Sequence, residues 1–248
     1  MYERELQIAI QAVKKAEPVF RKYFGTKPKV QSKGGDFRNI VSFVDRAIEK
    51  QLKDFLLKNS PNYGFVGEES GEINRGANFV WVVDPIDGTT NYIYGSPDCA
   101  ISIALLKNNS PVVGVTYSPV SKRFFQASNG SGAKLNGKPI KVSKVGEIKK
   151  TYGGFGWGRD VYFAKKMFPK WVPHVGKLRV LGSSTIALGS VAAGIYDFFV
   201  GHEMEIWDYA AGQILVEEAG GKFLTSKKPQ IQIATNKILA PKLLELLK

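Results

Sequence analysis

The chain has 248 residues, of which 44% are hydrophobic and 23% charged, proportions that are ordinary for a globular protein. No apolar stretch approaches the ~18 residues that a membrane-spanning helix needs, and the acidic residues among Met1–Glu5 lead us to expect no secretory signal and no membrane partner. The single cysteine, Cys99, excludes an intramolecular disulfide and predicts a reducing, cytoplasmic location.

The charge of the chain is strongly positive, at +13 from 35 Lys and Arg against 22 Asp and Glu. Such an excess could serve a nucleic-acid partner, an anionic substrate or a lysine-rich solvated surface. The basic residues are scattered and form no long run, which favours the solvated surface and predicts no nucleic-acid partner. A nucleic-acid-binding module stays an alternative that steeply salt-dependent DNA binding would support.

The N-terminal part predicts two amphipathic helices. Apolar residues recur at helical spacing over residues 2–23, where Pro18 should kink the helix or end its regular part. A second helix is predicted from about residue 42 to 58, and Ser42 followed by Asp45 resembles a capping box. The Gly-containing stretch 31–36 between them is interpreted as a flexible basic loop.

The remainder predicts strands followed by an alternating α/β pattern. Strands are expected at 64–67, 78–83, 99–107, 112–118 and 122–127. The second part predicts a helix from about 184 to 194, a strand at 195–200, a helix at 207–219, strands near 222–225 and 231–234, and a terminal helix from 240. We therefore expect an N-terminal α+β half at 1–145 and a C-terminal α/β half at 146–248.

The most informative residues are the nine from Asp84 to Tyr92, DPIDGTTNY, which follow a buried apolar run. Pro85 restricts Asp84 to extended backbone, and Gly88 permits a sharp change of direction. The two threonines that follow supply hydroxyl and N–H groups where a short helix could begin. Carboxylates beside a helix N-terminus can hold Mg²⁺ and a phosphate in one place.

Two other acidic segments could complete such a site. Glu68 and Glu69 end a short strand, and because adjacent residues there face different directions, we expect only one to point at the ion of Asp84. Asp208 lies in the first turn of a helix, where the helix dipole favours an anion. Taken alone, the turn of Glu68 and Glu69 is explained by solvation, and Asp208 is explained equally well as an ordinary carboxylate at a helix N-terminus. Together with Asp87 they form a set of hard oxygen ligands that suits Mg²⁺ or Mn²⁺ rather than zinc.

With these segments in place, the chain resembles the inositol monophosphatase superfamily of lithium-sensitive, metal-dependent phosphatases. The segments that carry the resemblance follow one another in order: Val41–Asp45, Gly67–Ser70, Asp84–Tyr92, Gly182–Ser184, and Trp207–Gly212 with Glu218–Gly221. The resemblance implies a layered αβαβα sandwich of the sugar-phosphatase type, with the site between its two halves. It also implies a homodimer.

The resemblance implies a set of metal ligands. Glu68, Asp84 and the backbone carbonyl of Ile86 correspond to ligands of a first Mg²⁺. Asp84, Asp87 and Asp208 correspond to ligands of a second, so that Asp84 bridges the two ions. Two or three Mg²⁺ per site are implied, and Mn²⁺ could replace them.

It also implies catalytic and substrate-binding residues. Thr89 and Asp45 correspond to the pair that orients the attacking water, and Glu69 to a second carboxylate near that water. The amides of Gly88 and Thr89 correspond to groups that hold the phosphate. The groups implied to meet the rest of the substrate are those of Gly182, Ser183 and Ser184.

The expected activity is Mg²⁺-dependent hydrolysis of small phosphate monoesters, inositol 1-phosphate or fructose 1,6-bisphosphate or both, by a metal-activated water. In inositol-preferring relatives a glutamate seven residues before the aspartate of the WD pair bonds the inositol hydroxyls, and here that position is Gly201. Strict inositol preference is therefore not expected. A phosphatase acting on 3′-phosphoadenosine 5′-phosphate is the alternative among enzymes.

Overall fold

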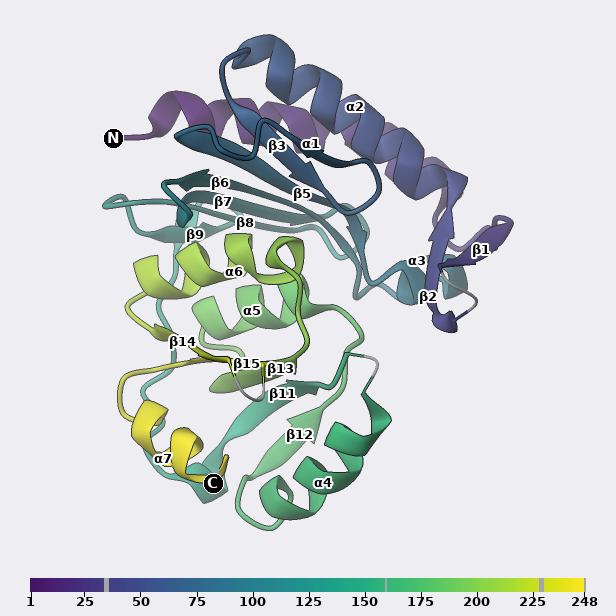
Figure 1. Ribbon diagram of the computed structural model, residues 1–248. Coiled ribbons are helices and arrows are strands. Elements are labelled where there is room, and N and C mark those ends of the chain that lie inside the picture. Colours follow the sequence, from purple (N-terminus) through teal and green to yellow (C-terminus); the bar gives the residue numbers. More distant parts are fainter. Residues whose placement is uncertain (34–35, 159, 228–229, 248) are drawn as a thin grey trace.

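The computed structural model describes residues 1–33, 36–158, 160–227 and 230–247. The elements stack in alternating layers of helix, sheet, helix, sheet and helix (Figure 1). This arrangement confirms the predicted αβαβα sandwich. A large sheet lies under two long N-terminal helices, and a smaller sheet lies at the opposite end of the molecule with two further helices on its outer face.

The outer layer is formed by α1 (Glu3–Tyr23) and α2 (Phe43–Asn59). Pro18 lies inside α1 without ending it, because a proline removes only one of the helical hydrogen bonds. The predicted capping box at the start of α2 is present. The Ser42 hydroxyl accepts from the Val44 N–H at 3.1 Å, and the Ser42 N–H donates to the Asp45 carboxylate at 2.9 Å.

The predicted flexible loop at 31–36 is wrong where the structure describes it. An antiparallel hairpin of β1 (Val30–Lys33) and β2 (Asp36–Ser42) occupies this region, with Val30 opposite Ser42. Residues 34 and 35 lie outside the described residues. The stretch 31–36 predicted a loop because it contains two glycines and no apolar alternation.

The large sheet has the strand order β10-β9-β8-β7-β6-β5-β3-β4. Within it β3 and β5 are parallel, whereas the other described pairs are antiparallel. The apolar runs of its central strands are buried against helices on both faces. The bounds are β3 (Gly64–Gly67), β4 (Gly71–Ile73), β5 (Phe79–Asp87), β6 (Ala100–Lys107), β7 (Ser110–Ser118), β8 (Arg123–Ser128), β9 (Ala133–Leu135) and β10 (Lys138–Pro139).

The small sheet has the order β12-β11-β13-β15-β14, with β11 parallel to both of its neighbours. The sequence did not predict β11, because its glycines carry no strand pattern. The reason for Gly153 is steric: a Cβ atom there would lie 2.5 Å from the ring of Phe198 on β13. The bounds are β11 (Tyr152–Gly156), β12 (Lys177–Arg179), β13 (Phe198–His202), β14 (Lys222–Lys227) and β15 (Gln230–Thr235).

Two further helices and a short 3₁₀ turn complete the small-sheet region. The outer helices are α4 (Val161–Trp171), which was not predicted, and α7 (Ala240–Glu245), and η1 (Ile148–Lys150) precedes β11. The strand predicted at 195–200 begins only at Phe198. The N–H groups of Ile195 and Tyr196 instead bond the Ser190 carbonyl in the turn that follows the preceding helix.

The middle layer consists of α5 (Ser184–Ala192) and α6 (Ile206–Glu218), which lie between the two sheets (Figure 1). Both helices meet protein on several sides, and small residues allow the close approach. A Cβ atom on Gly212 would lie 2.4 Å from Leu188, and one on Gly114 would lie 2.6 Å from the Ala211 carbonyl. This packing presses α6 against the large sheet, which brings the N-terminus of α6 toward the end of β5.

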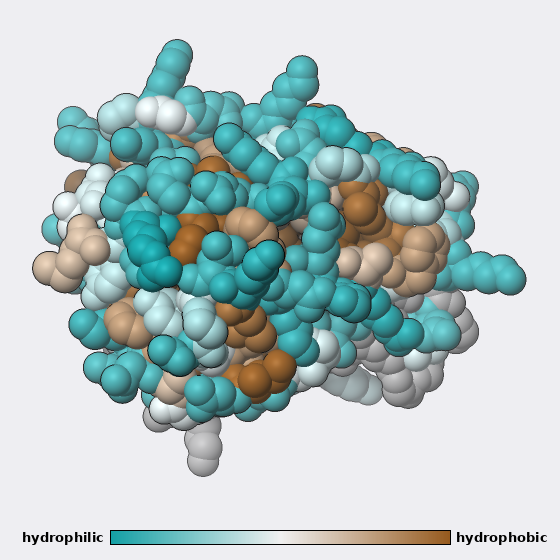
Figure 2. Space-filling view, turned by 90° about the horizontal axis from the view of Figure 1, so that it is seen from above, coloured by the Kyte–Doolittle hydropathy of each residue, from teal (hydrophilic) through white to brown (hydrophobic). Residues whose placement is uncertain are grey.

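The face over α1 and α2 is mainly hydrophilic, with smaller apolar patches between the polar side chains (Figure 2). In the part of the chain that the structure describes, no helix combines the length and the apolar character needed to cross a bilayer.

Candidate active site

Asp84 and Asp87 lie on the same strand, which runs further than predicted. β5 continues to Asp87 instead of ending at Val83, and it is irregular between the two aspartates. Asp84 pairs with Ser102 and Asp87 with Ala100, so three steps on β5 correspond to two on β6. In a regular strand, residues three apart face opposite sides. The extra residue at this bulge brings both carboxylates to the same side.

The acid cluster consists of Asp84, Asp87 and Asp208, which offer carboxylate oxygens within 4.8 Å of one another. Asp84 and Asp87 are buried and Asp208 is half-buried. Burial raises the pKa of Asp84 and of Asp208 well above the usual value, and neighbouring acids, Glu68 among them, raise both further. Glu68 therefore belongs to the same electrostatic environment as the acid cluster.

The chemistry of this cluster fits a metal ion. In the described part of the chain, no ion pair involves Asp84, Asp87 or Asp208. Buried carboxylates that repel one another are expensive unless a cation or protons neutralise them. Because oxygen ligands of this kind suit hard divalent cations, the cluster could hold a metal of the Mg²⁺ type.

Asp87 is held in place by the N-terminus of α5. Its carboxylate accepts hydrogen bonds from the Thr185 N–H at 2.8 Å, the Thr185 hydroxyl at 2.6 Å, the Ser184 N–H at 3.3 Å and the Ser183 hydroxyl. Burial raises the pKa of Asp87, although these hydrogen bonds act in the opposite direction. Thr185 was missed by the sequence reasoning. Its place directly after the predicted Gly182–Ser184 segment was the signal available.

The predicted turn at Gly88 is present, with a φ of +82° that favours glycine. A Cβ atom there would lie 2.9 Å from the Asp98 carbonyl and 3.2 Å from that of Gly182. Three residues further on, Asn91 connects two segments, because its side-chain amide donates to the carbonyls of Asp98 (2.7 Å) and Leu181 (2.6 Å). The turn at the start of α3 (Thr89–Tyr94) is thereby tied to the Gly182 segment.

Thr89 and Asp45 are in contact, as the resemblance implied. The Thr89 hydroxyl lies 3.2 Å from the Asp45 carboxylate and 3.1 Å from the Ile86 carbonyl, and it can donate to one of them at a time. Burial raises the pKa of Asp45, and Glu69 raises it further, although hydrogen bonds from Ser42 lower it. Glu69 thus acts on Asp45, whereas Glu68 acts on the acid cluster.

Glu49 is a buried carboxylate that the sequence reasoning missed. It lies on α2, one turn after Asp45, and accepts the N–H groups of Glu69 (2.8 Å) and Ser70 (2.6 Å). A Cβ atom on Gly67 would lie 2.6 Å from its carboxyl carbon, which explains the glycine there. The spacing of four residues from Asp45 on one helix face was the signal that could have found it.

A pocket of about 360 Å³ opens beside the acid cluster. Its residues include Asp87, Ser183 and Ser184 of the predicted site, together with aromatic and aliphatic side chains. Gly201 does not line this pocket. Met204 occupies the space that a side chain at position 201 would need, since a Cβ atom on Gly201 would lie 2.4 Å from the Met204 sulfur.

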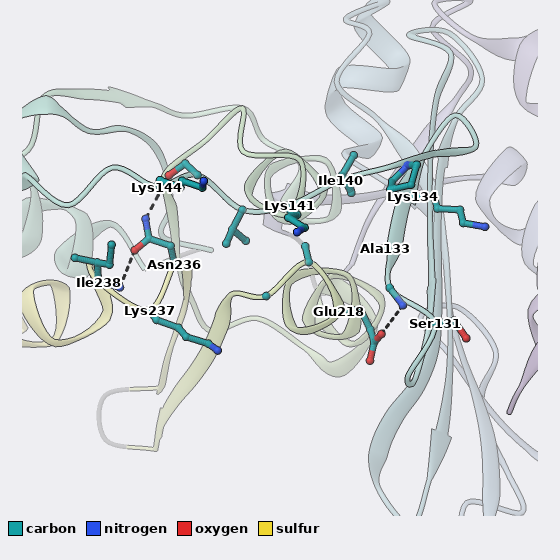
Figure 3. Close-up of a pocket in the computed structure, with 16 residues that line it drawn as sticks. Ser131, Ala133, Lys134, Ile140, Lys141, Lys144, Glu218, Asn236, Lys237 and Ile238 are labelled. Atoms are coloured by element: carbon teal, nitrogen blue, oxygen red, sulfur yellow. Dashed lines mark hydrogen bonds between the residues drawn. The ribbon is translucent and has the colours of Figure 1, made fainter.

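A larger pocket of about 490 Å³ lies at the opposite end of α6 (Figure 3). Figure 3 shows Glu218 at the end of this helix, hydrogen-bonded to the turn before Ala133, while Lys134 points away from the cavity. None of the predicted site residues lines this pocket. Size alone therefore does not identify the candidate site.

Asp160, His202 and Glu203, here called the histidine cluster, are the second group of potential ligands among the described residues. Both ring nitrogens of His202 have partners, the Gln230 carbonyl at 2.8 Å and the Asp160 carboxylate at 3.3 Å. The His202 ring also stacks on Phe163 at 3.7 Å between centroids. These contacts account for the buried histidine without a ligand.

The sequence profile of the inositol monophosphatase family matches residues 1–247. The chain belongs to this family. It is 34% identical over 233 residues to the fructose-1,6-bisphosphatase/inositol-1-monophosphatase of Aquifex aeolicus, covering 92% of this chain and 88% of that one. It is 36% identical over 224 residues to the Nus factor SuhB of Escherichia coli, covering 87% and 83%.

Solved structures agree with this assignment. The extragenic suppressor protein suhB from Bartonella henselae superposes with a TM-score of 0.92 at 31% identity, over 99% of this chain and 98% of that one. The protein is therefore a phosphatase of the inositol monophosphatase family, a family of metal-dependent hydrolases. The comparisons favour neither the nucleotide phosphatase nor the nucleic-acid-binding alternative.

Proposed function

We propose that this inositol monophosphatase-family enzyme hydrolyses small phosphate monoesters in a Mg²⁺-dependent reaction, with inositol 1-phosphate or fructose 1,6-bisphosphate or both as substrates. The observation that carries the proposal is the acid cluster. Asp84 and Asp87 from one strand meet Asp208 from a helix far along the chain, within 4.8 Å. The name of the Aquifex relative supports both substrates.

The residues proposed to hold the metal are those implied by the resemblance. Asp84, Asp87 and Asp208 would supply the carboxylates, with Glu68 and the Ile86 carbonyl completing two or three Mg²⁺ sites, which Mn²⁺ could also fill. Divalent cations bound there neutralise the phosphate dianion and stabilise the leaving alkoxide. Without such help, phosphate monoester hydrolysis is among the slowest uncatalysed reactions.

The attacking water is proposed to be oriented by Thr89, Asp45 and Glu69. When the Thr89 hydroxyl donates to the Asp45 carboxylate, its oxygen remains free to accept a hydrogen from a water molecule. The lone pair of that water then faces away from Thr89. Asp45 is buried, and its carboxylate accepts hydrogen bonds from the Ser42 N–H and hydroxyl, which fix the position from which it can hold the Thr89 hydroxyl in one orientation.

The phosphate and the alcohol are proposed to lie on either side of Asp87. The N–H groups of Gly88 and Thr89 would contact the phosphate at the start of α3. Gly182, Ser183 and Ser184 would contact the rest of the substrate, beside the pocket of about 360 Å³. The hydroxyl of Ser183 already donates to Asp87, so its contribution includes fixing this ligand.

The test is phosphate release from three esters, with Mg²⁺ and with EDTA. We expect inositol 1-phosphate and fructose 1,6-bisphosphate to be hydrolysed only with Mg²⁺, and Li⁺ to inhibit. A higher kcat/KM for 3′-phosphoadenosine 5′-phosphate would replace the substrate proposal by the nucleotide alternative. Equal rates in EDTA would overturn the metal assignment.

We also propose a division into two halves, a homodimeric assembly and a cellular location. Residues 1–145 and 146–248 are proposed to be the two halves that meet at the site, since Asp208 and the Gly182–Ser184 segment come from the second. A homodimer follows from the family resemblance, and sedimentation at twice the 27.3 kDa chain mass would support it. A cytoplasmic location stays a prediction from the single, buried Cys99.

A further inference from the structure

The larger pocket, at the C-terminal end of α6, has an aliphatic lining. Its volume of about 490 Å³ lies within the range of small-molecule sites, and the proposed reaction uses none of its residues. Ile238 is 53% exposed, which is unusual for an isoleucine. The aliphatic side chains that line the pocket are those of Ala133, Ile140, Val142, Ala219 and Ile238. The cavity therefore offers an apolar surface that water covers in the free protein.

Three exposed lysines surround this apolar surface. Lys141, Lys144 and Lys237 line the pocket. In the view of Figure 3, Lys141 and Lys144 lie along the upper side of the cavity and Lys237 along the lower side. The ion pairs among the described residues include none of these three. Their ammonium groups are therefore available to an anion.

Glu218 is the one acid among the described residues that line the pocket, and its carboxylate is already engaged. One oxygen accepts the N–H of Gly130 at 2.9 Å, and the other accepts the N–H of Gly132 at 2.7 Å. Figure 3 shows Glu218 turned toward this turn, to the side of the lysines. The charge of the pocket is therefore positive, and Glu218 serves to hold one of its walls.

The walls are fixed by hydrogen bonds that join distant segments. The buried Asn236 donates to the Val145 carbonyl at 2.9 Å, and its side-chain oxygen accepts the Ile238 N–H at 2.9 Å. The Val142 N–H donates to the Ala219 carbonyl at 3.2 Å. These bonds connect the segment after β10 to the end of α6 and to the segment after β15. A ligand thus meets a formed cavity, which lowers the entropy cost of binding.

We propose that this cavity, here called the basic pocket, binds a small organic anion with an aliphatic body. The aliphatic body lies on the apolar lining, and a sulfonate, carboxylate or phosphate headgroup contacts the lysines. A concave cavity of this volume suits a small molecule better than a protein surface. The site is separate from the acid cluster and does not depend on the proposed function.

Neither half of the basic pocket would be selective alone. An exposed lysine attracts an anion only weakly, because water and salt screen the charge. An apolar lining alone would take a neutral or a cationic chain as readily as an anionic one. A ligand that covers the lining places its headgroup beside the lysines and excludes water there, which strengthens the attraction.

The test is calorimetric titration with butane-, hexane- and octanesulfonate, which the enzyme cannot hydrolyse as phosphate esters. The protein is kept free of divalent metal, so that the carboxylates of the acid cluster repel the sulfonate. Affinity should rise about threefold for each methylene that becomes buried. Octyltrimethylammonium, with the same chain and the opposite charge, should bind at least about 10-fold more weakly than octanesulfonate. Added NaCl should weaken sulfonate binding.

Variants locate the binding in the basic pocket. The double variant Lys141→Gln and Lys237→Gln should lower the affinity for octanesulfonate at least about 10-fold. The matched control is Lys14→Gln with Lys58→Gln, which removes two exposed charges from the helices of the outer layer and should bind normally. Ile238→Asp places an acid in the pocket and should also weaken binding at least about 10-fold. Ile238→Ala should weaken it less, since only apolar area is lost.

The outcomes are decisive in either direction. Equal affinity for the sulfonate and the ammonium, or no dependence on chain length, would overturn the proposed ligand class. Equal losses in the two double variants, or unchanged binding to folded Ile238→Asp, would overturn the location. Urea unfolding verifies that each variant is folded. Hydrolysis of inositol 1-phosphate by Ile238→Asp should match the wild type, and failure of the proposed function would leave the titrations unchanged.

Discussion

The acid cluster and the histidine cluster differ in how their charges are satisfied. Asp84, Asp87 and Asp208 are like charges, and the ion pairs of the described residues include none of them. In the histidine cluster, Asp160 faces His202 and also caps α4 by accepting the Phe163 N–H at 2.9 Å. Proximity of potential ligands is therefore a weak criterion, and uncompensated negative charge is the stronger one.

The largest expected effect is a loss of turnover, which distinguishes the acid cluster from the histidine cluster. Asp84→Asn and Asp208→Asn should each lower kcat by at least about 10³-fold, because a neutral amide cannot replace a charged ligand. The metal-free variants should unfold at the same or higher urea concentration than the wild type, since repulsion within the cluster is relieved. Kinetics and urea unfolding measure the two effects. Near-normal turnover in both variants would reject the metal assignment.

The next effect concerns the support of the site rather than its ligands. Glu49→Gln should weaken Mn²⁺ binding about 10- to 100-fold, because an amide cannot accept both N–H groups of the turn after Gly67. Calorimetric titration with Mn²⁺ measures this without turnover. Asp54→Asn, an exposed change on the same helix, is the matched control and should bind normally.

Removal of the Thr185 hydroxyl should have a smaller effect on the same measurement. Thr185→Val keeps the shape and the N–H bond to Asp87 but loses the 2.6 Å hydroxyl contact. We expect Mn²⁺ affinity to fall about 10-fold, at the lower end of such effects, because the other donors to Asp87 remain. Affinity equal to that of the wild type would show that Thr185 does not position this ligand.

The pH dependence of stability should follow from the acid cluster. Because the pKa values of Asp84 and Asp208 are raised above the usual 3.8, the metal-free folded chain binds more protons than the unfolded chain between 3.8 and the raised values. The free energy of unfolding should therefore fall as pH rises through this window. Mg²⁺ should stabilise more at higher pH, where its ligands are deprotonated. Urea unfolding across pH with and without Mg²⁺ measures both trends, and a metal-free stability that rises with pH would contradict them.

The smallest expected effect belongs to the histidine cluster. Asp160→Ala should lower the free energy of unfolding by about 1 kcal/mol through loss of the α4 cap. It should change kcat less than about twofold, since surface and cap residues act on stability rather than on chemistry. A large loss of turnover, or Zn²⁺ binding that this variant abolishes, would show that the two clusters are less different than their partners indicate.

Much of the fold was predictable because its signals are local. Helical spacing marked α1 and α2, and the Ser42–Asp45 capping box is formed as predicted. By contrast, β11 was not predicted, because its glycines give no strand pattern. They are required by the rings of Phe198 and Phe199, which lie far along the chain and leave no room for a Cβ atom. The hairpin of β1 and β2 was not predicted because residues 31–36 contain two glycines and no apolar alternation, a pattern that is typical of a loop.

The amino-acid sequence by itself determined the chemistry available: carboxylates at Asp84 and Asp87, the left-handed turn at Gly88, and an acid at the start of α6. Contiguous residues encode these features, since they depend on local backbone freedom and on side-chain type. Only the tertiary structure decided that the bulge in β5 turns both aspartates to one side and that Thr185 and Glu49 support the site. Those contacts depend on how α5 and α6 pack between the sheets and on how α2 lies over them. Packing of this kind is a property of segments distant in sequence.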